Sequence, residues 1–440
     1  MGALARHAAV LGLIPPARRF GSVAAVRGAL IEVDGLLGAA RLGAHLVVNT
    51  DAGPLDAEVT ALSRGSALCL PFAEPRGLAT GQRAELAGDQ LALRPGAGWL
   101  GRVVDGLGRP IDGKGPLPTG PQSRAVRAEP PPAAARARVG GKLATGVTAL
   151  DIFAPLCRGQ RLGLFAGSGI GKSTLLAKLA RGCGSDVAVI GLIGERGREL
   201  QDFLTDTLGE DGLARSVVVV ATSDAPALLR RQAAWTTLAI AEQFRDDGAE
   251  VLCLMDSVTR FAMAQREIGL ANGEPPASKG YTPSVFAELP RLLERAGPGL
   301  PGSGSITAIF TVLVDGDDHD EPVADAVRGI LDGHVVMSRR IAERGRYPAI
   351  DVLKSVSRTL PHCHSGEDNA LRLAAAELLS RYAEVEELVR LGAYRAGSDP
   401  ATDRAIALAP QIEALLGQGA LADPFAALGR ILSADDGADA

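Results

Sequence analysis

The stretch from Ala166 to Thr174 constrains the fold of this chain more than any other. It reads Ala-Gly-Ser-Gly-Ile-Gly-Lys-Ser-Thr, follows an apolar run at 161–165 and precedes a helical run at 175–181. Glycines let consecutive backbone N–H groups curl around a phosphate, and the positive end of the following helix favours the same anion. Ala166 replaces the first glycine of the usual pattern, but the glycines that form the cradle remain. We therefore expect a phosphate-binding loop between a strand and a helix.

Two side chains of this loop have expected roles. Lys172 would reach the outer phosphates of a nucleotide, and the Ser173 hydroxyl would hold Mg²⁺. The alternative is a glycine-rich turn that binds nothing, which the strand–loop–helix context disfavours. The residues expected to bind nucleotide are Ala166, Gly167, Ser168, Gly169, Ile170, Gly171, Lys172, Ser173 and Thr174.

Apolar runs alternate with helical stretches after residue 140. Continuous apolar strands separated by helices are typical of a parallel sheet covered on both faces, so we expect an α/β core. The candidate strands are Arg161–Phe165, Asp186–Ile193, Ser216–Thr222, Glu250–Met255 and Ser305–Val314.

Two carboxylates stand at the ends of these candidate strands. Asp256 ends the apolar run that starts at Glu250, where it can hold Mg²⁺ through a bound water. Glu195 follows the strand at 186–193, where it can polarise the water that attacks a phosphate. Asp256 could instead be a solvated strand end. Glu195 could equally be a surface residue that pairs with Arg196 or Arg198.

The two ends of the chain differ from this core. Residues 21–95 carry short apolar runs between glycines, which predicts a small β-barrel. Residues 96–368 would form the α/β domain, with a proline-rich surface connector at 115–135, and 369–440 a helical domain. Residues 1–20 read as a short amphipathic segment. The barrel runs are Ala29–Val33, Leu46–Val48, Ala57–Leu62 and Ala67–Leu70, and the C-terminal helical runs are Ala370–Leu391 and Pro400–Leu416.

Composition excludes several classes of protein. Lys and Arg total 46 against 51 Asp and Glu, and the net charge of −5 argues against a dominant nucleic-acid surface. The five cysteines are far apart and odd in number, so we expect no disulfide framework and a reduced, cytoplasmic setting. No apolar run approaches the roughly 20 residues that cross a bilayer.

These motifs together resemble the family of ring-forming ATPases that includes the rotary ATP synthase subunits and the type III protein-export ATPases. The resemblance covers nearly the whole chain and implies a RecA-like core, ATP and Mg²⁺. It makes Lys172 and Ser173 the phosphate-loop residues, Glu195 the catalytic glutamate, Arg196 its neighbouring arginine and Asp256 the Mg²⁺-associated aspartate. The non-catalytic synthase subunit has glutamine at the position of Glu195, so this chain resembles a catalytic member.

Two further positions extend the resemblance. An aromatic residue at the position of Tyr347 packs on adenine in the family, and an arginine at the position of Arg358 reaches the neighbouring subunit's site. A guanidinium delivered in trans is worth about 10³ to 10⁵ in rate. The alternative for Arg358 is a local surface arginine. Because one chain carries both Glu195 and Arg358, complete sites require copies of the same chain, and we expect a homohexameric ring.

Three segments resemble the export branch, and the last of them most resembles the flagellum-specific ATPases. They are Gly316–Asp325, Asp332–Val336 and Gly392–Ile406. The resemblance implies that ATP hydrolysis promotes unloading and unfolding of flagellar subunits at the export gate. It also implies a stator-like regulatory protein at residues 1–20, a stalk-like protein, an export-gate membrane protein and chaperone–substrate complexes as partners, on the cytoplasmic side of the inner membrane.

Two other functions stay open. A virulence injectisome ATPase shares most of these motifs. A nucleic-acid translocase would need aromatic stacking platforms in the barrel, and Phe72 is the only aromatic residue between Gly21 and Leu93.

Two signals for metal binding are set aside. His362, Cys363 and His364 are adjacent and lack the spacing of zinc sites. The acidic stretch 315–320 begins like a calcium loop, but Asp320 and Ala326 stand where that loop needs glycine and glutamate.

Overall fold

The computed structural model describes residues 18–63, 65–314 and 321–433. Most of the predicted N-terminal docking segment (1–20) and the acidic stretch 315–320 lie outside these residues. These residues form two compact units, one of residues up to 91 together with 268–274 and the other of the remainder.

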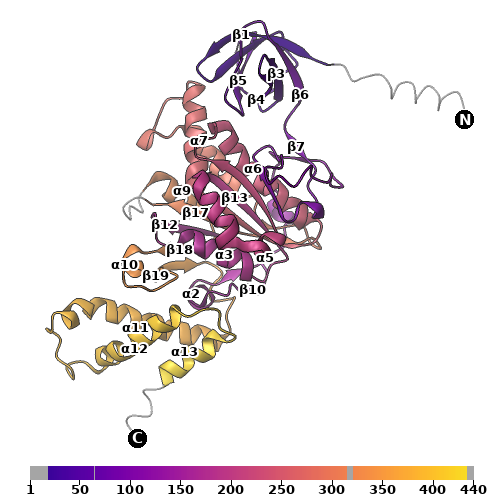
Figure 1. Cartoon of the computed structure of the whole chain (residues 1–440). Helices are drawn as coiled ribbons and strands as arrows, with labels where there is room; N and C mark the ends of the chain where they lie inside the picture. The colour runs from indigo at the N-terminus through magenta and orange to yellow at the C-terminus, as the bar shows by residue number, and fades with distance from the viewer. Residues whose placement is uncertain (1–17, 64, 315–320, 434–440) are drawn as a thin grey trace, which may run out of the picture. The chain divides into compact units, whose positions relative to one another are not determined.

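The first unit contains a closed six-stranded barrel (Figure 1). Inward residues of alternating strand positions, such as Ile31, Val33, Leu46 and Val48, form its core. The four predicted runs are β2 to β5, whereas β1 and β6 were not predicted because each buries few large apolar side chains. The strands are β1 (Phe20–Arg27), β2 (Leu30–Asp34), β3 (His45–Thr50), β4 (Gly53–Leu62), β5 (Ser66–Pro71) and β6 (Arg83–Gly88).

The second unit is built on a nine-stranded sheet within the described residues. Its main strand order is β19-β18-β12-β17-β15-β13-β14-β8, and the central strands are parallel. The prediction of a parallel sheet is confirmed. The five predicted strands are β12 (Arg161–Ala166), β13 (Val187–Glu195), β14 (Ser216–Thr222), β15 (Glu250–Asp256) and β17 (Ser305–Leu313).

Strands at both edges of this sheet were not predicted. They are β8 (Arg102–Asp105), β18 (Gly333–Met337) and β19 (Ile350–Ser357), with the short β16 (Gly297–Pro298) beside β17. β8 has only four residues, too few to form a recognisable apolar run. β19 pairs antiparallel to β18 and alternates buried with exposed positions, so it lacks the continuous apolar run of the central strands.

Helices cover both faces of the sheet (Figure 1). Ile190 and Leu192 of β13 share an apolar cluster with Leu175 of α3 (Lys172–Gly182). Gly191, which points the other way, lies against Thr237 of α6 (Ala227–Asp246), where a Cβ would come within 2.5 Å of the hydroxyl. Other helices of this part are α2 (Thr148–Phe153), α4 (Gly197–Asp202), the π-helical η3 (Phe203–Leu208), α5 (Gly209–Ala214), α7 (Val258–Ala271), α8 (Pro283–Leu293), α9 (Pro322–Ile330) and α10 (Arg339–Glu343), with short 3-10 turns at η1 (Ala97–Trp99), η2 (Ala133–Ala135) and η4 (Ser278–Gly280).

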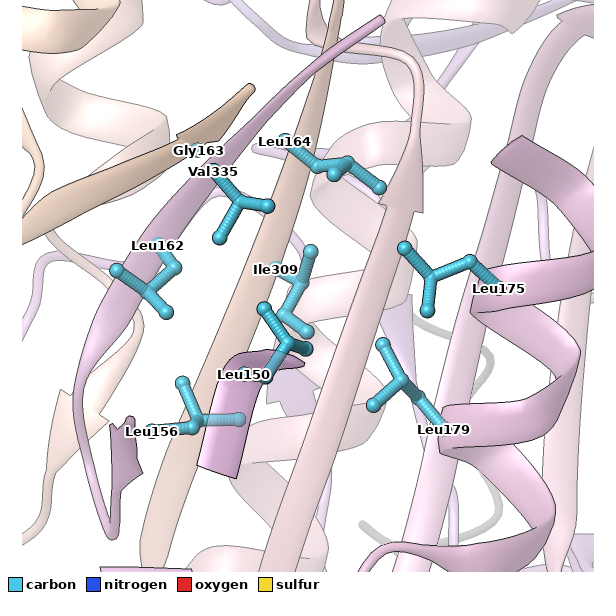
Figure 2. A pocket seen from close by; sticks show the side chains of 9 residues that line it. All are labelled: Leu150, Leu156, Leu162, Gly163, Leu164, Leu175, Leu179, Ile309 and Val335. Atoms are coloured by element: carbon cyan, nitrogen blue, oxygen red, sulfur yellow. The ribbon is translucent and has the colours of Figure 1, made fainter. Parts of the chain in front are cut away.

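A small apolar gap lies between β12 and α3, beneath the phosphate loop. Figure 2 shows leucines of β12 and α3 converging on a gap of about 10 Å³, close to the limit for one water. Its lining carries no polar side chain, so we expect it to stay dry. The helix that follows the loop is therefore fixed to the strand that precedes it. The lining residues are Leu150, Leu156, Leu162, Gly163, Leu164, Leu175, Leu179, Ile309 and Val335.

The C-terminal part is helical, with α11 (Gly366–Arg390), α12 (Pro400–Leu416) and α13 (Pro424–Ser433). The first two match the predicted helical runs, and α13 was not predicted separately. Ser365 caps α11 by accepting a hydrogen bond from the Asp368 N–H, and Asp399 caps α12 ahead of Pro400. None of the helices described in the structure is long and apolar enough to cross a membrane.

Candidate active site

The predicted phosphate loop connects β12 to α3. Gly169 and Gly171 have φ of +77° and +86°, which L side chains rarely adopt. These conformations turn the loop over the first turn of α3, where Ser173 and Thr174 are exposed. The glycines are thus required by the backbone path, and the N–H groups of the helix start remain available to an anion.

Lys172 is the first residue of α3 and lies between two carboxylates. Its Nζ forms an ion pair with Asp256, and it lies 3.6 Å from the Glu195 Oε1. β13 and β15 are neighbouring parallel strands with Leu192 opposite Asp256, so their carboxyl ends bring Glu195 and Asp256 to one edge. The three side chains form one charged cluster beside the loop.

Asp256 is held in a fixed position at the end of β15. Its side chain is 4% exposed and accepts a hydrogen bond of 2.7 Å from the Thr311 hydroxyl on β17. Sequence reasoning missed Thr311, which is one of three hydroxyl residues in β17, so its sequence position alone did not single it out. Carboxylate and hydroxyl oxygens are the ligands that Mg²⁺ prefers, so Asp256 and the exposed Ser173 fit this metal.

Glu195 lies at the end of β13 in a partly buried setting. Burial, and then the charge of Asp256, raise the pKa of its carboxyl group, while Lys172 and Arg260 oppose the rise. Gly194 has a φ of +72°, and a Cβ there would lie 3.0 Å from Arg260 of α7. Sequence reasoning missed Arg260, which stands four residues after Asp256. The geometry favours the active-site interpretation of Glu195 over a surface ion pair.

Arg196 takes a different direction from Glu195. Its side chain is 81% exposed and pairs with Glu199 at 3.2 Å. It does not join the cluster of Lys172, Glu195 and Asp256 in this structure, so a catalytic role for Arg196 stays a prediction.

Tyr347 lies on the other side of the phosphate loop. A Cβ on Gly171 would be 3.5 Å from the Tyr347 ring, and this side chain is half exposed. A pocket of about 330 Å³ opens here, and Arg339 donates a hydrogen bond of 3.2 Å to the Ser168 carbonyl at its rim. No sequence motif singles out Arg339. An exposed aromatic face beside a phosphate loop offers a stacking surface for a flat base.

Arg358 lies far from this loop. It follows β19, its N–H donates to the Asp332 carbonyl at 2.9 Å, and the Asp332 side chain binds Arg161 at the start of β12. The loop follows the other end of that strand, six residues away. At roughly 3.3 Å per residue the two positions are about 20 Å apart. The exposed Arg358 therefore cannot act on a phosphate in its own chain's loop.

Family models and known proteins match this chain closely. Residues 146–357 match the ATP synthase alpha/beta family, nucleotide-binding domain, and residues 365–425 the T3SS EscN ATPase C-terminal domain. The "Flagellum-specific ATP synthase" of Caulobacter vibrioides is 56% identical, over 96% of this chain and 98% of its own length. The "Type 3 secretion system ATPase" of Xanthomonas euvesicatoria is 49% identical, over 90% and 89%.

Solved structures agree with the sequence relatives. The assembled ATPase EscN of the enteropathogenic E. coli type III secretion system has a TM-score of 0.85 and 40% identity, covering 94% of this chain and 100% of that one. EscN in complex with its central stalk EscO has the same TM-score and 41% identity, with the same coverage. The predicted resemblance and fold class are confirmed. The chain belongs to the ATP synthase alpha/beta family, among the flagellum-specific and type III secretion ATPases, and is an ATPase.

Proposed function

We propose that this chain hydrolyses ATP with Mg²⁺ to promote flagellar protein export, by unloading and unfolding subunits at the export gate. The observation that carries the enzymatic part is the convergence of Lys172, Glu195 and Asp256 beside the glycine loop. The fold alone would allow many functions, whereas this cluster supplies a phosphate-binding cation, a metal-binding oxygen and a base at one sheet edge.

Binding of ATP would use the loop and the start of α3. Backbone N–H groups and Lys172 would hold the phosphates, and Tyr347 would stack on adenine. Ser173 would hold Mg²⁺ directly and Asp256 through a water. When bound, the metal neutralises charge that develops on the phosphates. The hydrogen bond from Thr311 keeps the Asp256 carboxylate oriented for this role.

Glu195 would orient and polarise the attacking water. A base is most effective when its pKa approaches the working pH, and the raised pKa of Glu195 moves it in that direction. Arg260, packed against Gly194, would hold the end of β13 in place. Replacing the Glu195 carboxylate by an amide keeps the shape of the site and removes the base.

A complete site would need two copies of the chain. Arg358 is exposed and about 20 Å from its own loop, so its role in phosphoryl transfer requires a neighbour's nucleotide. A homohexameric ring, in which every interface is the same, satisfies this need for all copies. The relative EscN, described as assembled, supports self-association.

The partners proposed for this ring follow from the family. A stalk-like protein at the ring centre is supported by the complex of EscN with its central stalk EscO. Residues 1–20 would dock a stator-like regulator, and the ring would meet the export-gate membrane protein and chaperone–substrate complexes at the cytoplasmic face of the inner membrane. We propose no nucleic-acid partner, because the barrel's Phe72 is buried and the ring of its other aromatic residue, Phe20, is covered by the Arg83 guanidinium 3.8 Å away.

An injectisome ATPase is the second candidate, favoured by the similarity to EscN and to the Xanthomonas secretion ATPase. The Caulobacter flagellar relative is more similar than the Xanthomonas protein, which supports the flagellar role. Deletion of the gene and complementation with wild type or Lys172→Ala separates the two. Loss of motility restored only by wild type supports flagellar export, whereas normal motility with lost effector secretion overturns it.

The trans role of Arg358 is tested by activity against protein concentration. Arg358→Ala should lose the part of ATPase activity that rises with concentration, by about 10³-fold at saturation. Lys354→Ala, which removes an exposed cation of β19, the strand just before Arg358, is the control. Activity of Arg358→Ala that matches wild type at all concentrations would contradict the model.

A further inference from the structure

Two cysteines from distant parts of the chain meet away from the ATP site. Cys157 ends the two-residue strand β11 (Leu156–Cys157), and Cys363 lies in the turn between β19 and α11. The Cys157 thiol donates a hydrogen bond of 3.4 Å to the Thr359 hydroxyl, which lies 3.5 Å from the Cys363 sulfur. Thr359 therefore contacts both thiols. No step of ATP hydrolysis uses them.

The surroundings make the two thiols chemically unequal. The neighbouring Cys157 thiol lowers the pKa of Cys363 to about 6, with help from Thr359 and Lys142 against the effect of burial. In turn, Cys363 and burial raise the pKa of Cys157. Lys142 lies opposite Cys157 on β10 (Lys142–Leu143), and the cation Arg372 faces Cys363 from α11. This environment favours the thiolate at Cys363, and the Thr359 hydroxyl, 3.5 Å from its sulfur, can donate a hydrogen bond to it.

The neighbouring histidine does not share this charge. Burial, and then the charge of Lys142, lower the pKa of His364 to about 4, so the ring is neutral at the pH where Cys363 ionises. It packs edge-on against Phe425, with ring centroids 4.9 Å apart. The cations near Cys363 are therefore Lys142 and Arg372, and both favour its thiolate.

The two thiols also differ in solvent exposure, and the thiol with the lower pKa is the more exposed one. Cys363 is partly exposed, whereas Cys157 is 1% exposed. The other cysteines, Cys69, Cys183 and Cys253, are buried, and burial raises the pKa of each to about 12. A small reagent that enters from solvent would meet a thiolate at Cys363 and protonated, covered thiols at those three positions.

We propose that Cys363 is a site of reversible oxidation by hydroperoxides and that Cys157 is its resolving thiol. The Cys363 thiolate attacks one peroxide oxygen, the O–O bond breaks, and water or an alcohol leaves with a proton. The sulfenic acid so formed is attacked by the Cys157 sulfur, an S–S bond forms, and hydroxide leaves as water with the Cys157 proton. The two thiols lose two electrons, which reduce the peroxide, and an added dithiol reverses the reaction.

The test uses the full-length protein and hydrogen peroxide at stoichiometric amounts. Free thiols are then blocked with iodoacetamide, and peptides are mapped by mass spectrometry. We expect a Cys157–Cys363 linked peptide that dithiothreitol removes. Cys157→Ser should instead accumulate a dimedone-reactive sulfenic acid at Cys363, and Cys363→Ser should leave Cys157 reduced. Cys183→Ser, a buried cysteine elsewhere, should behave as wild type.

Two results would overturn the proposal. One is peroxide-treated wild type in which both Cys157 and Cys363 are alkylated and unlinked. The other is a linked peptide that joins a different pair of cysteines. The rate of iodoacetamide labelling gives a further check, because Cys363 should react near its maximal rate already at pH 7, whereas a rate that still rises tenfold per pH unit above pH 7 contradicts its assignment as a thiolate.

The disulfide would also act on the neighbouring arginine, a consequence that rests on the proposed function. Thr359 directly follows Arg358, and its hydroxyl lies 2.9 Å from the Ser357 hydroxyl, which accepts a hydrogen bond from Gln160. Closing the disulfide breaks the thiol hydrogen bonds to Thr359. We therefore expect peroxide to lower the concentration-dependent ATPase activity of wild type reversibly, and to leave that of Cys157→Ser and Cys363→Ser less affected.

The failures of these ideas can be told apart. The peptide map alone decides the redox site. A mapped disulfide with unchanged ATPase activity overturns the link to Arg358. Loss of the proposed function would instead appear as unchanged activity of reduced Lys172→Ala.

Discussion

Lys172 lies between Asp256 and Glu195, and each of these three side chains has a different expected role. Replacing one of them at a time therefore tests each role separately. Glu195→Gln should bind ATP with near-normal affinity and hydrolyse it about 10²- to 10⁴-fold more slowly, because only the base is lost. Nucleotide titration and phosphate release measure the two effects. Glu199→Gln, an exposed glutamate of the same segment, is the control. Turnover of Glu195→Gln that stays near the wild-type rate would refute the assigned role.

The pH dependence of the reaction also depends on Glu195. Burial raises the pKa of this carboxyl group, so the deprotonated base is lost at a higher pH than an ordinary glutamate would predict. On acidification kcat/KM should fall with a midpoint above the usual pKa of about 4.3. A pH profile measured between pH 4 and 8 checks this, and a midpoint at or below the ordinary glutamate value contradicts it.

Some residues of the site could be predicted from the local sequence, and others could not. The loop from Gly167 to Ser173 was predictable because its chemistry requires consecutive backbone groups. Asp256 and Glu195 were predictable because strand ends converge in parallel sheets. Thr311 and Arg260 act across strand and helix contacts, and only the register of β15 with β17 or the packing on Gly194 identifies them.

One buried ion pair holds the proline-rich connector (115–135) against helix α6. Arg295 donates to the Glu242 carboxylate on α6 at 2.6 and 2.8 Å and to the Val126 carbonyl at 2.5 Å, and both side chains are almost fully buried. Arg295→Met leaves Glu242 buried and unpaired, which should cost about 3–5 kcal/mol of unfolding free energy. Urea-induced unfolding measures the loss. Arg291→Met removes an exposed guanidinium and leaves its buried partner Glu288 paired with Arg127, so stability should change little.

Replacing Glu242 as well shows whether Arg295→Met loses stability through an unpaired charge or through altered packing. The double variant Arg295→Met with Glu242→Leu removes the unpaired charge and should recover much of the stability. A double variant as unstable as Arg295→Met would show that packing, not the lone carboxylate, accounts for the effect.

The packing of β12 on α3 fixes the phosphate loop at the level of elements. Leu164 lines the small gap of Figure 2, so Leu164→Ala enlarges an existing void and should destabilise the protein by about 2–5 kcal/mol. The midpoint of thermal unfolding should fall accordingly. Leu373→Ala, at a half-exposed position of α11, should change it little, and equal shifts in both variants would contradict this account.

Elements differ in how far sequence defines them. The five central strands were predicted because burial on both faces demands continuous apolar runs. β1 and β6 of the barrel and β19 of the sheet were missed because each has one exposed side, and short polar alternation resembles loop sequence. Closure of the barrel pairs β1 with β6, and such distant pairing leaves no local trace.

At the scale of the whole molecule, the placement of Arg358 predicts complementation between inactive chains. Lys172→Ala and Arg358→Ala should each be inactive in the assembled state. Mixed in equal amounts and reassembled, they should regain about one quarter of the sites, because one random interface in four joins an intact Lys172 to an intact Arg358. ATPase assays before and after mixing measure this. Absence of recovery in rings shown to contain both chains would rule out shared sites.

Strand β19 connects Tyr347 to Arg358. Tyr347 precedes the strand and lies beside the phosphate loop of its own chain, whereas Arg358 follows the strand at its opposite end. The eight residues of β19, at roughly 3.3 Å each, separate the Tyr347 ring, proposed to stack on a base, from the Arg358 guanidinium, proposed to act on the nucleotide of another subunit. Pairing with β18 makes this segment stiff. In the proposed ring, a shift of Tyr347 on nucleotide release would move Arg358 in the adjacent site. The subunits would then hydrolyse ATP one after another and not independently.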